Sequence, residues 1–358
     1  MYGHAPYREV LTHGVFVDAE GRKMSKSLGN TVAPDKIYQQ YGADVLRLWV
    51  AATDYRGEMT VSEEIFKQVS DSYRRIRNTA RFMLANLNGF DPAKHTIRPG
   101  EMLAMDYWIV RRCQLLQTEL MSHYSDYNFL GVYQKIHNFC VVELGGFYLD
   151  VIKDRQYTLK SDSLARRSTQ TAMFHILEMF SRLIAPIISF TADEIWENIP
   201  GDRADSVFLT NFSDAVEDLP ELSELDDQYW STLMEVRSAV NKELEAKRSE
   251  KVIGSGLSAE LELFCSANLM ADLKRLEEEL RFVLIVSKAS VYDIDDADSS
   301  AKPTGISGLK IRVEASNFEK CDRCWHHHVS VGKNSDHPLL CERCITNVEG
   351  EGETRRFA

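Results

Sequence analysis

Apolar residues recur at spacings of three and four through the middle of the chain, which is the period of an amphipathic α-helix. Between residues 60 and 250 this pattern forms long segments separated by glycine, proline or polar residues. Thr60 and Glu63 have the spacing of a capping box and predict the start of the first helix. Short connections between consecutive helices predict an antiparallel bundle. The long helices are expected to begin near Thr60, Asp106, Asn128, Leu164 and Asp227.

The pattern is different before the bundle. Residues 10–18 have the composition of a strand, and helices are predicted to start at Pro34 and Gly42. A strand and two short helices are typical of the end of an α/β domain and cannot close a core alone. We therefore expect this part to complete a larger domain.

After the bundle the apolar period changes to two. Residues 257–263 alternate apolar and polar side chains, which predicts a half-buried strand. Residues 268–280 are predicted to be helical, and the apolar runs 282–286 and 309–313 are predicted to be strands. Together these elements predict a small α+β module.

The predicted fold is mainly α, an antiparallel helix bundle between the end of an α/β domain and a small α+β module with a cysteine-rich end. The acidic stretch 201–225 is predicted to be a connecting loop. The predicted regions are 1–57 (end of the α/β domain), 58–250 (helical domain), 251–316 (α+β module) and 317–358 (cysteine-rich end).

Composition restricts the class of protein. Of the 358 residues, 44% are hydrophobic and 27% charged, which is ordinary for a soluble globular protein. The apolar runs are too short to cross a bilayer, and the first six residues lack the pattern of a secretory signal, so we expect a cytoplasmic protein with no membrane partner. A net charge of −12 argues against a DNA-coating protein but allows RNA binding through a local basic stripe.

Four of the seven cysteines form two C-x-x-C pairs near the end of the chain. Two such pairs can complete a tetrahedral, closed zinc site, and the metal would then be structural. Disulfides are the alternative, but they are rare in cytoplasmic proteins. Cys113, Cys140 and Cys265 are interpreted as buried apolar residues. The predicted zinc ligands are Cys321, Cys324, Cys341 and Cys344, and the nearby His326, His327, His328 and His337 are interpreted as surface residues.

A doubly cationic segment lies near the start of the chain. Two lysines flank small residues there, and ammonium groups can stabilise negative charge that develops on a triphosphate. The alternative is a solvated basic turn, which is the ordinary interpretation of two lysines alone. The segment is Lys23-Met24-Ser25-Lys26-Ser27, and Gly29 and Asn30 follow it.

The wider context of this segment resembles the class I aminoacyl-tRNA synthetases, and within them the isoleucine, valine and leucine group. The resemblance rests on Gly14, Asp18, residues 21–30 and the later Gly42-Ala43-Asp44-x-Leu46-Arg47-x-Trp49. It implies that Lys26 contacts ATP during adenylate formation, with Lys23 and the backbone of Met24 close by, and Ser25 and Ser27 in the same nucleotide-binding loop. The family's His-Ile-Gly-His motif does not occur, so the resemblance covers the C-terminal part of such an enzyme.

The cysteine-rich end narrows the resemblance to the bacterial isoleucyl-tRNA synthetases. Residues 321–325 and 352–358 are similar to that family's C-terminus. Valine enzymes usually end in a coiled-coil arm instead. The same type of zinc finger closes certain DNA glycosylases, but those use an N-terminal proline, and this chain begins Met1-Tyr2-Gly3.

A basic stripe lies on the first bundle helix. Arg74, Arg77 and Arg81 share one helical face and could follow RNA phosphates. The family resemblance suggests that the bundle binds the anticodon stem-loop, and that Trp325 or Phe357 stacks on an unpaired base. The alternatives are solvated or salt-bridged arginines, and a tryptophan that packs on its own zinc module.

These features predict the C-terminal part of an isoleucine–tRNA ligase. Its partners would be isoleucine tRNA and, in the complete enzyme, isoleucine and Mg-ATP, with one structural Zn²⁺ and a monomeric state implied by the resemblance. Because the amino-acid pocket is not recognised in this sequence, we expect no adenylate formation by the chain alone. The alternatives are a stand-alone tRNA-binding module without catalysis and the equivalent part of a valyl or leucyl enzyme.

Overall fold

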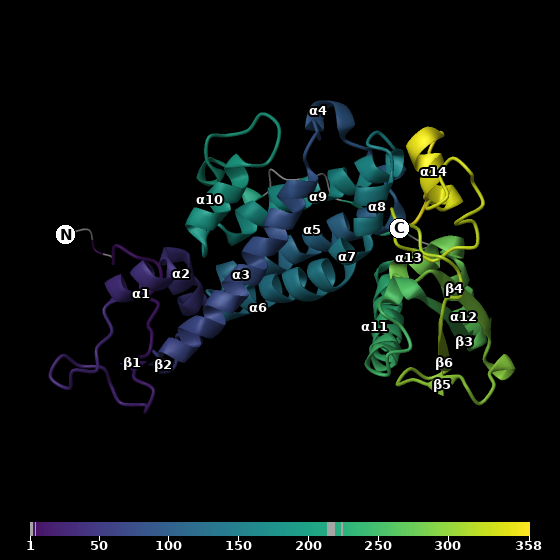
Figure 1. Cartoon of the computed structure of the whole chain (residues 1–358). Coiled ribbons are helices and arrows are strands. Elements are labelled where there is room, and N and C mark those ends of the chain that lie inside the picture. Colours follow the sequence, from purple (N-terminus) through teal and green to yellow (C-terminus); the bar gives the residue numbers. More distant parts are fainter. Residues whose placement is uncertain (1–2, 4, 213–218, 223–224) are drawn as a thin grey trace. The chain divides into compact units, whose positions relative to one another are not determined.

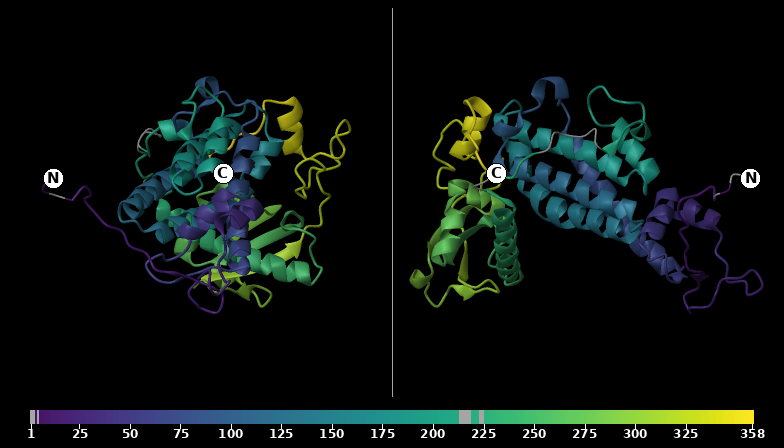
Figure 2. Two further views of the ribbon diagram at one scale, coloured as in Figure 1. Left: turned by 90° about the vertical axis from the view of Figure 1, so that its left-hand side faces the viewer. Right: turned by 180° about the vertical axis from the view of Figure 1, so that it is seen from behind.

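The computed structural model describes residues 3, 5–212, 219–222 and 225–358, and Figures 1 and 2 show its helices and strands. The chain divides into two compact units. Unit 1 comprises Met1–Ala85, Cys113–Glu143 and His175–Val216, and unit 2 comprises Asn86–Arg112, Leu144–Phe174 and Glu217–Ala358. The mainly α fold predicted from the sequence is confirmed.

Unit 1 begins with a two-stranded parallel sheet made of β1 (Phe16–Val17) and β2 (Met59–Thr60). Between these strands lie α1 (Pro34–Tyr41) and α2 (Ala43–Ala51), which pack against each other. The strand predicted over residues 10–18 is therefore much shorter in the structure. No side chain fits at Gly14, where a Cβ would lie 1.7 Å from the carbonyl oxygen of Gly57.

The first long helix, α3 (Glu63–Asn86), begins later than the capping box predicts. Thr60 lies in β2 opposite Val17, so its backbone is extended and paired in the sheet. The hydroxyl of Ser62 instead accepts the N–H of Ile65 at 3.2 Å. The predicted capping box is wrong, because sheet pairing fixes Thr60 outside the helix. The apolar face of α3 is as predicted, since Val69, Ile76 and Ala80 are buried.

Unit 1 also contains α6 (Phe129–Asn138) and α10 (Ser189–Glu197), whereas α5 (Ala104–Ser125) and α9 (Leu164–Ile184) are divided between the two units. Asn128 caps α6 by accepting the N–H of Gly131 at 3.1 Å. The 3₁₀ turn η3 (Val207–Leu209) lies in the stretch 201–225, and the remainder of that predicted loop includes residues 213–218 and 223–224, which fall outside the described residues.

A π-helix follows α6. This segment, η2 (Phe139–Tyr148), continues the third predicted helix with wider turns. Its apolar side chains Cys140, Leu144 and Phe147 are buried, as the helical pattern predicts, while Gly145 and Gly146 are exposed. Apolar spacing alone did not distinguish this winding from an α-helix.

Unit 2 contains α11 (Asp227–Ser249) and a four-stranded sheet in the order β4-β3-β6-β5. The sheet strands are β3 (Ala259–Cys265), β4 (Lys288–Asp293), β5 (Lys302–Pro303) and β6 (Leu309–Ala315). β3 runs parallel to β4 and antiparallel to β6. The strands predicted at 257–263 and 309–313 are thus present, with slightly different ends.

The strand predicted over residues 282–286 is wrong. Phe282 to Leu284 belong to α13 (Leu280–Leu284), and Ile285 ends the helix with a left-handed φ of 54°. A parallel pair of strands needs a long crossover connection, and the segment between β3 and β4 is occupied by α12 (Ala267–Lys274), η6 (Glu277–Glu279) and α13. A short apolar run is compatible with a buried helix as well as with a strand. Here the run lies in the crossover connection between two parallel strands, and that connection is helical.

The helical part of unit 2 has a polar cluster within its core. Asp106 accepts two hydrogen bonds from Arg155, both 2.8 Å long, and further bonds from Tyr148 and Ser168. Trp108 stacks on Trp230 with ring centroids 5.4 Å apart.

The remaining elements of the described chain are α4 (Pro92–His95), η1 (Pro99–Glu101), α7 (Leu149–Val151), α8 (Lys153–Thr158), η5 (Gly256–Ser258), η7 (Ile294–Asp296) and α14 (Glu342–Glu349).

Among the helices that the structure describes, none combines the length and apolar character that a membrane span would require.

Candidate functional site

The lysine loop, defined here as residues 23–30, is held at its base by side-chain hydrogen bonds. The carboxylate of Asp18 accepts the backbone N–H groups of Glu20 and Arg22 and also Asn30 Nδ2, the last at 2.9 Å. Asn30 Oδ1 in turn accepts the N–H of Ser25 at 2.9 Å. The hydrogen bond from Asn30, helped by Arg22, holds the pKa of Asp18 well below its usual range. The loop therefore has a fixed base.

Its two lysines are solvent-facing. Lys23 and Lys26 are exposed, and neither ammonium group forms a salt bridge with any residue that the structure describes. The backbone N–H of Met24 donates to Phe16 O at 3.0 Å, which joins the loop to β1. The arrangement leaves two cationic groups available to an anion beside a backbone that is hydrogen-bonded to β1 and to Asn30.

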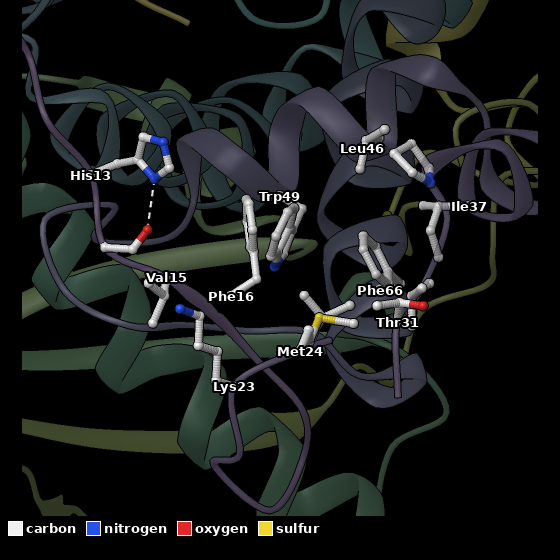
Figure 3. A pocket seen from close by; sticks show the side chains of 14 residues that line it. His13, Val15, Phe16, Lys23, Met24, Thr31, Ile37, Leu46, Trp49 and Phe66 are labelled. Atoms are coloured by element: carbon white, nitrogen blue, oxygen red, sulfur yellow. Dashed lines mark hydrogen bonds between the residues drawn. The ribbon is translucent and has the colours of Figure 1, made fainter. Parts of the chain in front are cut away.

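A cavity of about 530 Å³ opens next to the loop. Lys23 and Met24 line one part of it, and the other walls are mainly apolar, with Met24 facing the rings of Phe16, Trp49 and Phe66 (Figure 3). Trp49 lies 5.8 Å from Phe16 and 5.3 Å from Phe66 between ring centroids. Lys26 is not among the lining residues, so the structure places the two lysines in different surroundings.

The predicted basic stripe lies on α3, and two of its arginines have acidic neighbours. Arg77 donates from both terminal nitrogens to Glu194 of α10, at 2.6 and 2.8 Å, and Arg74 pairs with Asp71. Arg81 is exposed and forms no salt bridge within the described chain. Exposed pairs of this kind contribute little to stability, and phosphate oxygens can replace a carboxylate on the same guanidinium group. The arginine stripe (Arg74, Arg77 and Arg81) remains suited to phosphates.

The structure brings the four C-terminal cysteines together. Their sulfur atoms lie within 4.8 Å of one another and all four residues are buried. Cys324 Sγ and Cys341 Sγ are 3.7 Å apart, too far for a disulfide but close to the sulfur separation of about 3.8 Å in a tetrahedral zinc–thiolate centre. These thiols fit Zn²⁺, and the metal they would hold is structural because four ligands complete its coordination.

The neighbouring histidines do not belong to this cluster. His327 Nδ1 bonds to Phe318 O, His328 Nδ1 to Ser330 Oγ, and His337 Nε2 to Glu349 at 2.6 Å. His326 was interpreted as a surface residue, and this is wrong because it is buried with its ring edge against Phe282. The sharp chain reversal of the first C-x-x-C pair, where Trp325 has a φ of 65°, turns the His326 side chain inward.

Trp325 stays accessible beside the cysteines. Its side chain is 60% exposed, and the ammonium group of Lys320 lies 5.3 Å from its ring centroid. Trp325, Arg323 and Tyr157 line a cavity of about 330 Å³. Phe357 is only half-buried, and its N–H donates to Glu279 at 3.0 Å. The Trp325 ring thus has the exposure that base stacking requires.

A buried ionic cluster anchors the zinc module (residues 317–358) to α8. Asp154 accepts two hydrogen bonds from Arg343, at 2.7 and 2.8 Å, and one from Arg355 at 2.7 Å. Burial alone would raise the pKa of Asp154, but the two guanidinium groups outweigh it and lower the pKa to about 2. Sequence reasoning missed Asp154, because Arg343 lies 189 residues away along the chain.

Three known protein families match separate parts of the chain. The family of class I tRNA synthetases (I, L, M and V) matches residues 1–62, and the anticodon-binding domain of tRNA ligase matches residues 106–263. The zinc finger found in FPG and IleRS matches residues 318–347.

Two relatives that match over almost the whole chain carry the same name. An isoleucine–tRNA ligase of Pseudomonas putida (strain W619) is 58% identical over 355 residues, which are 99% of this chain and 38% of the relative. That of Methylococcus capsulatus (strain ATCC 33009 / NCIMB 11132 / Bath) is 56% identical over 357 residues, again 38% of the relative. This chain is similar to the C-terminal portion of isoleucine–tRNA ligases. The predicted resemblance is confirmed, and the zinc-finger match with the thiol cluster supports one structural Zn²⁺.

A solved structure also matches part of the chain. It is the ternary complex of Agrobacterium radiobacter K84 agnB2 LeuRS with tRNA and LeuAMS, at 21% identity and a TM-score of 0.40. The match covers 53% of this chain and 22% of that one.

Proposed function

We propose that this chain supplies the lysine loop and the anticodon-binding part of an isoleucine–tRNA ligase. The observation that carries the proposal is the 58% identity to such a ligase along 99% of the chain, since it includes the loop, the bundle and the cysteine cluster in the same order. The chain spans 38% of the length of these relatives, and the activity of a whole enzyme is part of the proposal.

The lysine loop would act on Mg-ATP. In adenylate formation the isoleucine carboxylate attacks the α-phosphorus, the bond to the bridging oxygen breaks, and pyrophosphate leaves with its electrons. Lys26 and Lys23 would stabilise the negative charge that grows on the phosphates, while the backbone of Met24 and the small Ser25 and Ser27 allow the nucleotide to approach closely. The fixed base at Asp18 and Asn30 supports this role, because preoriented charges need no rearrangement during the reaction.

The helical domain would bind isoleucine tRNA. Three arginines would contact RNA phosphates, namely Arg74, Arg77 and Arg81. The first two would release their acidic partners, Asp71 and Glu194, when they bind a phosphate. Trp325 would stack on an unpaired base, and its exposure supports that role. Zinc would act indirectly, by holding the chain reversal that carries Trp325. We further propose a cytoplasmic monomer, in which the buried thiols remain reduced.

The test is binding of isoleucine tRNA to the 358-residue chain at several salt concentrations, with valine tRNA as the competitor. We expect preferential binding of isoleucine tRNA that is lost on zinc chelation. Arg81→Gln should lower the slope of log affinity against log salt by about 0.7 to 1. Arg75→Gln is the matched control, since Arg75 is an exposed arginine off the stripe on the same helix, and it should leave the slope unchanged.

Equal binding of both tRNAs would contradict the proposed specificity of this part. Absence of any tRNA binding at low salt would contradict the RNA-binding role itself.

A further inference from the structure

Helix α2 contains an acidic residue that caps another helix. Asp44 is buried in the first turn of α2, and its Oδ2 accepts the N–H of Thr191 at 2.7 Å and the Thr191 hydroxyl at 2.6 Å. Asp44 Oδ1 also accepts the N–H of Phe190 at 3.3 Å. These N–H groups belong to the first turn of α10, where backbone donors have no partner within the helix. A carboxylate at a helix N-terminus is also favoured by the helix dipole.

One turn further along α2, a basic residue binds the other side of the same corner. Arg47 Nε donates to Ile187 O at 2.7 Å, and its Nη2 donates to Pro186 O at 2.8 Å. These carbonyl groups follow directly after the end of α9 at Ile184. The guanidinium group of Arg47 thus donates to two carbonyl groups of the linker between α9 and α10. Asp44 and Arg47 together form a clamp on the corner between α9 and α10.

This clamp joins the two proposed binding surfaces of unit 1. On one side, α2 packs on α1, which begins at Pro34, four residues after the lysine loop. On the other side, α10 contacts the helix that carries the arginine stripe. Thr191 Oγ1 lies 2.8 Å from Tyr73 Oη, and Glu194 pairs with Arg77.

We propose that Asp44 and Arg47 are positioning residues that set the distance between the lysine loop and the arginine stripe. The meaning of this distance rests on the proposed function, in which the loop faces ATP and the stripe faces RNA. The clamp consists of hydrogen bonds, which depend on both distance and direction. It therefore fixes the position of the helix corner more closely than an apolar contact would. A merely stabilising role would instead change the unfolding temperature and leave the position of the loop unaltered.

Pulsed electron spin resonance can measure this distance directly in the whole chain. All seven native cysteines are buried, so spin labels can be confined to two introduced thiols. Leu28→Cys lies in the loop, where the leucine is 68% exposed, and Asn78→Cys lies on an exposed position of α3. The doubly labelled chain should give one narrow distribution of distances.

In this background Asp44→Ala should shift the distance distribution or make it about twice as wide, because three donors of α10 lose their acceptor. Arg47→Gln should give a smaller change in the same direction, and it keeps the test informative if Asp44→Ala does not fold. Asp44→Asn retains one acceptor and should restore most of the narrow distribution. Asp35→Asn, an exposed aspartate on α1, is the matched control and should not alter it.

Unchanged distributions in folded Asp44→Ala and Arg47→Gln chains would overturn the proposal, even with lowered unfolding temperatures. The measurement needs neither ATP nor tRNA, so its result is separate from that of the proposed function. If the parent chain binds no tRNA, the function fails and the clamp is still tested. If the parent binds tRNA and the clamp variants keep the parent distribution, the clamp fails alone.

Discussion

The lysine loop and the cysteine cluster are both short motifs, but they differ in the solvent exposure of their functional groups. The loop presents its charged groups to solvent, and side-chain hydrogen bonds of Asp18 and Asn30 hold its base. The cluster directs all four sulfur atoms inward and buries them. A group that handles a substrate must remain accessible, whereas a structural metal centre is stable when it is closed. The same difference predicts how each motif responds to substitution.

The largest effect is expected at the cluster. Cys344→Ala removes one of four thiolates, and because binding of structural zinc contributes on the order of 10 kcal/mol, the zinc module should unfold and tRNA affinity should fall at least tenfold. Zinc content and tRNA binding measure this. Cys265→Ala is the matched control, a buried cysteine outside the cluster, and it should retain stoichiometric zinc. Full zinc in Cys344→Ala would contradict the closed four-thiolate site.

A smaller effect is expected where the zinc module meets α8. Asp154→Asn removes the negative charge that compensates the buried guanidinium groups of Arg343 and Arg355. It should destabilise unit 2 by about 3 kcal/mol. The folded pKa of about 2 lies below the ordinary 3.8, so the stabilisation by Asp154 is present above pH 4 and is lost as the pH falls towards 2.

Thermal unfolding of both chains between pH 2 and 7 measures this effect. The parent should lose about 2 kcal/mol more than Asp154→Asn on acidification. Parallel losses in the two chains would show that Asp154 is not the group responsible. Asp162→Asn offers a control, because Asp162 is an exposed aspartate of the same unit.

At the loop the effect should be local. Asn30→Ala removes the acceptor of the Ser25 N–H, and the loss of about 1 kcal/mol should speed hydrogen exchange of that amide roughly fivefold. The global unfolding temperature should stay within about 2 °C. Lys36→Ala on α1 serves as the control, since Lys36 is exposed. A global destabilisation as large as that of Asp154→Asn would contradict the expectation that substitutions in the lysine loop have only local effects.

The smallest effect concerns the loop lysines. Lys26 has no salt bridge in the described part of the chain, so Lys26→Ala should change the free energy of unfolding by less than about 0.5 kcal/mol. Denaturant titration measures this change. A marked loss of stability would mean that the lysine supports the fold, which would weaken its proposed role with ATP.

The sequence revealed the parts of this molecule that depend on local spacing. Helix faces such as that of Val69, Ile76 and Ala80 follow from a period of 3.6, and the cysteine pairs follow from two residues between ligands. The crossover helix α13 was mistaken for a strand, because five apolar residues fit either structure. The ion pairs of Asp154 and the capping bonds of Asp44 join residues more than 140 positions apart, and no local pattern encodes such partners.

The π-helix η2 makes the chain sensitive to its own length. Every residue of a helix turns the chain about the helix axis, so deleting one of the exposed glycines, Gly145 or Gly146, would rotate everything that follows in the helix. Tyr148 would lose its bond to Asp106, and Asp150 its bond to Arg237. A one-residue gap at this point is therefore far more damaging than substitution of either glycine, and homologous chains should preserve the spacing here more strictly than the residues themselves.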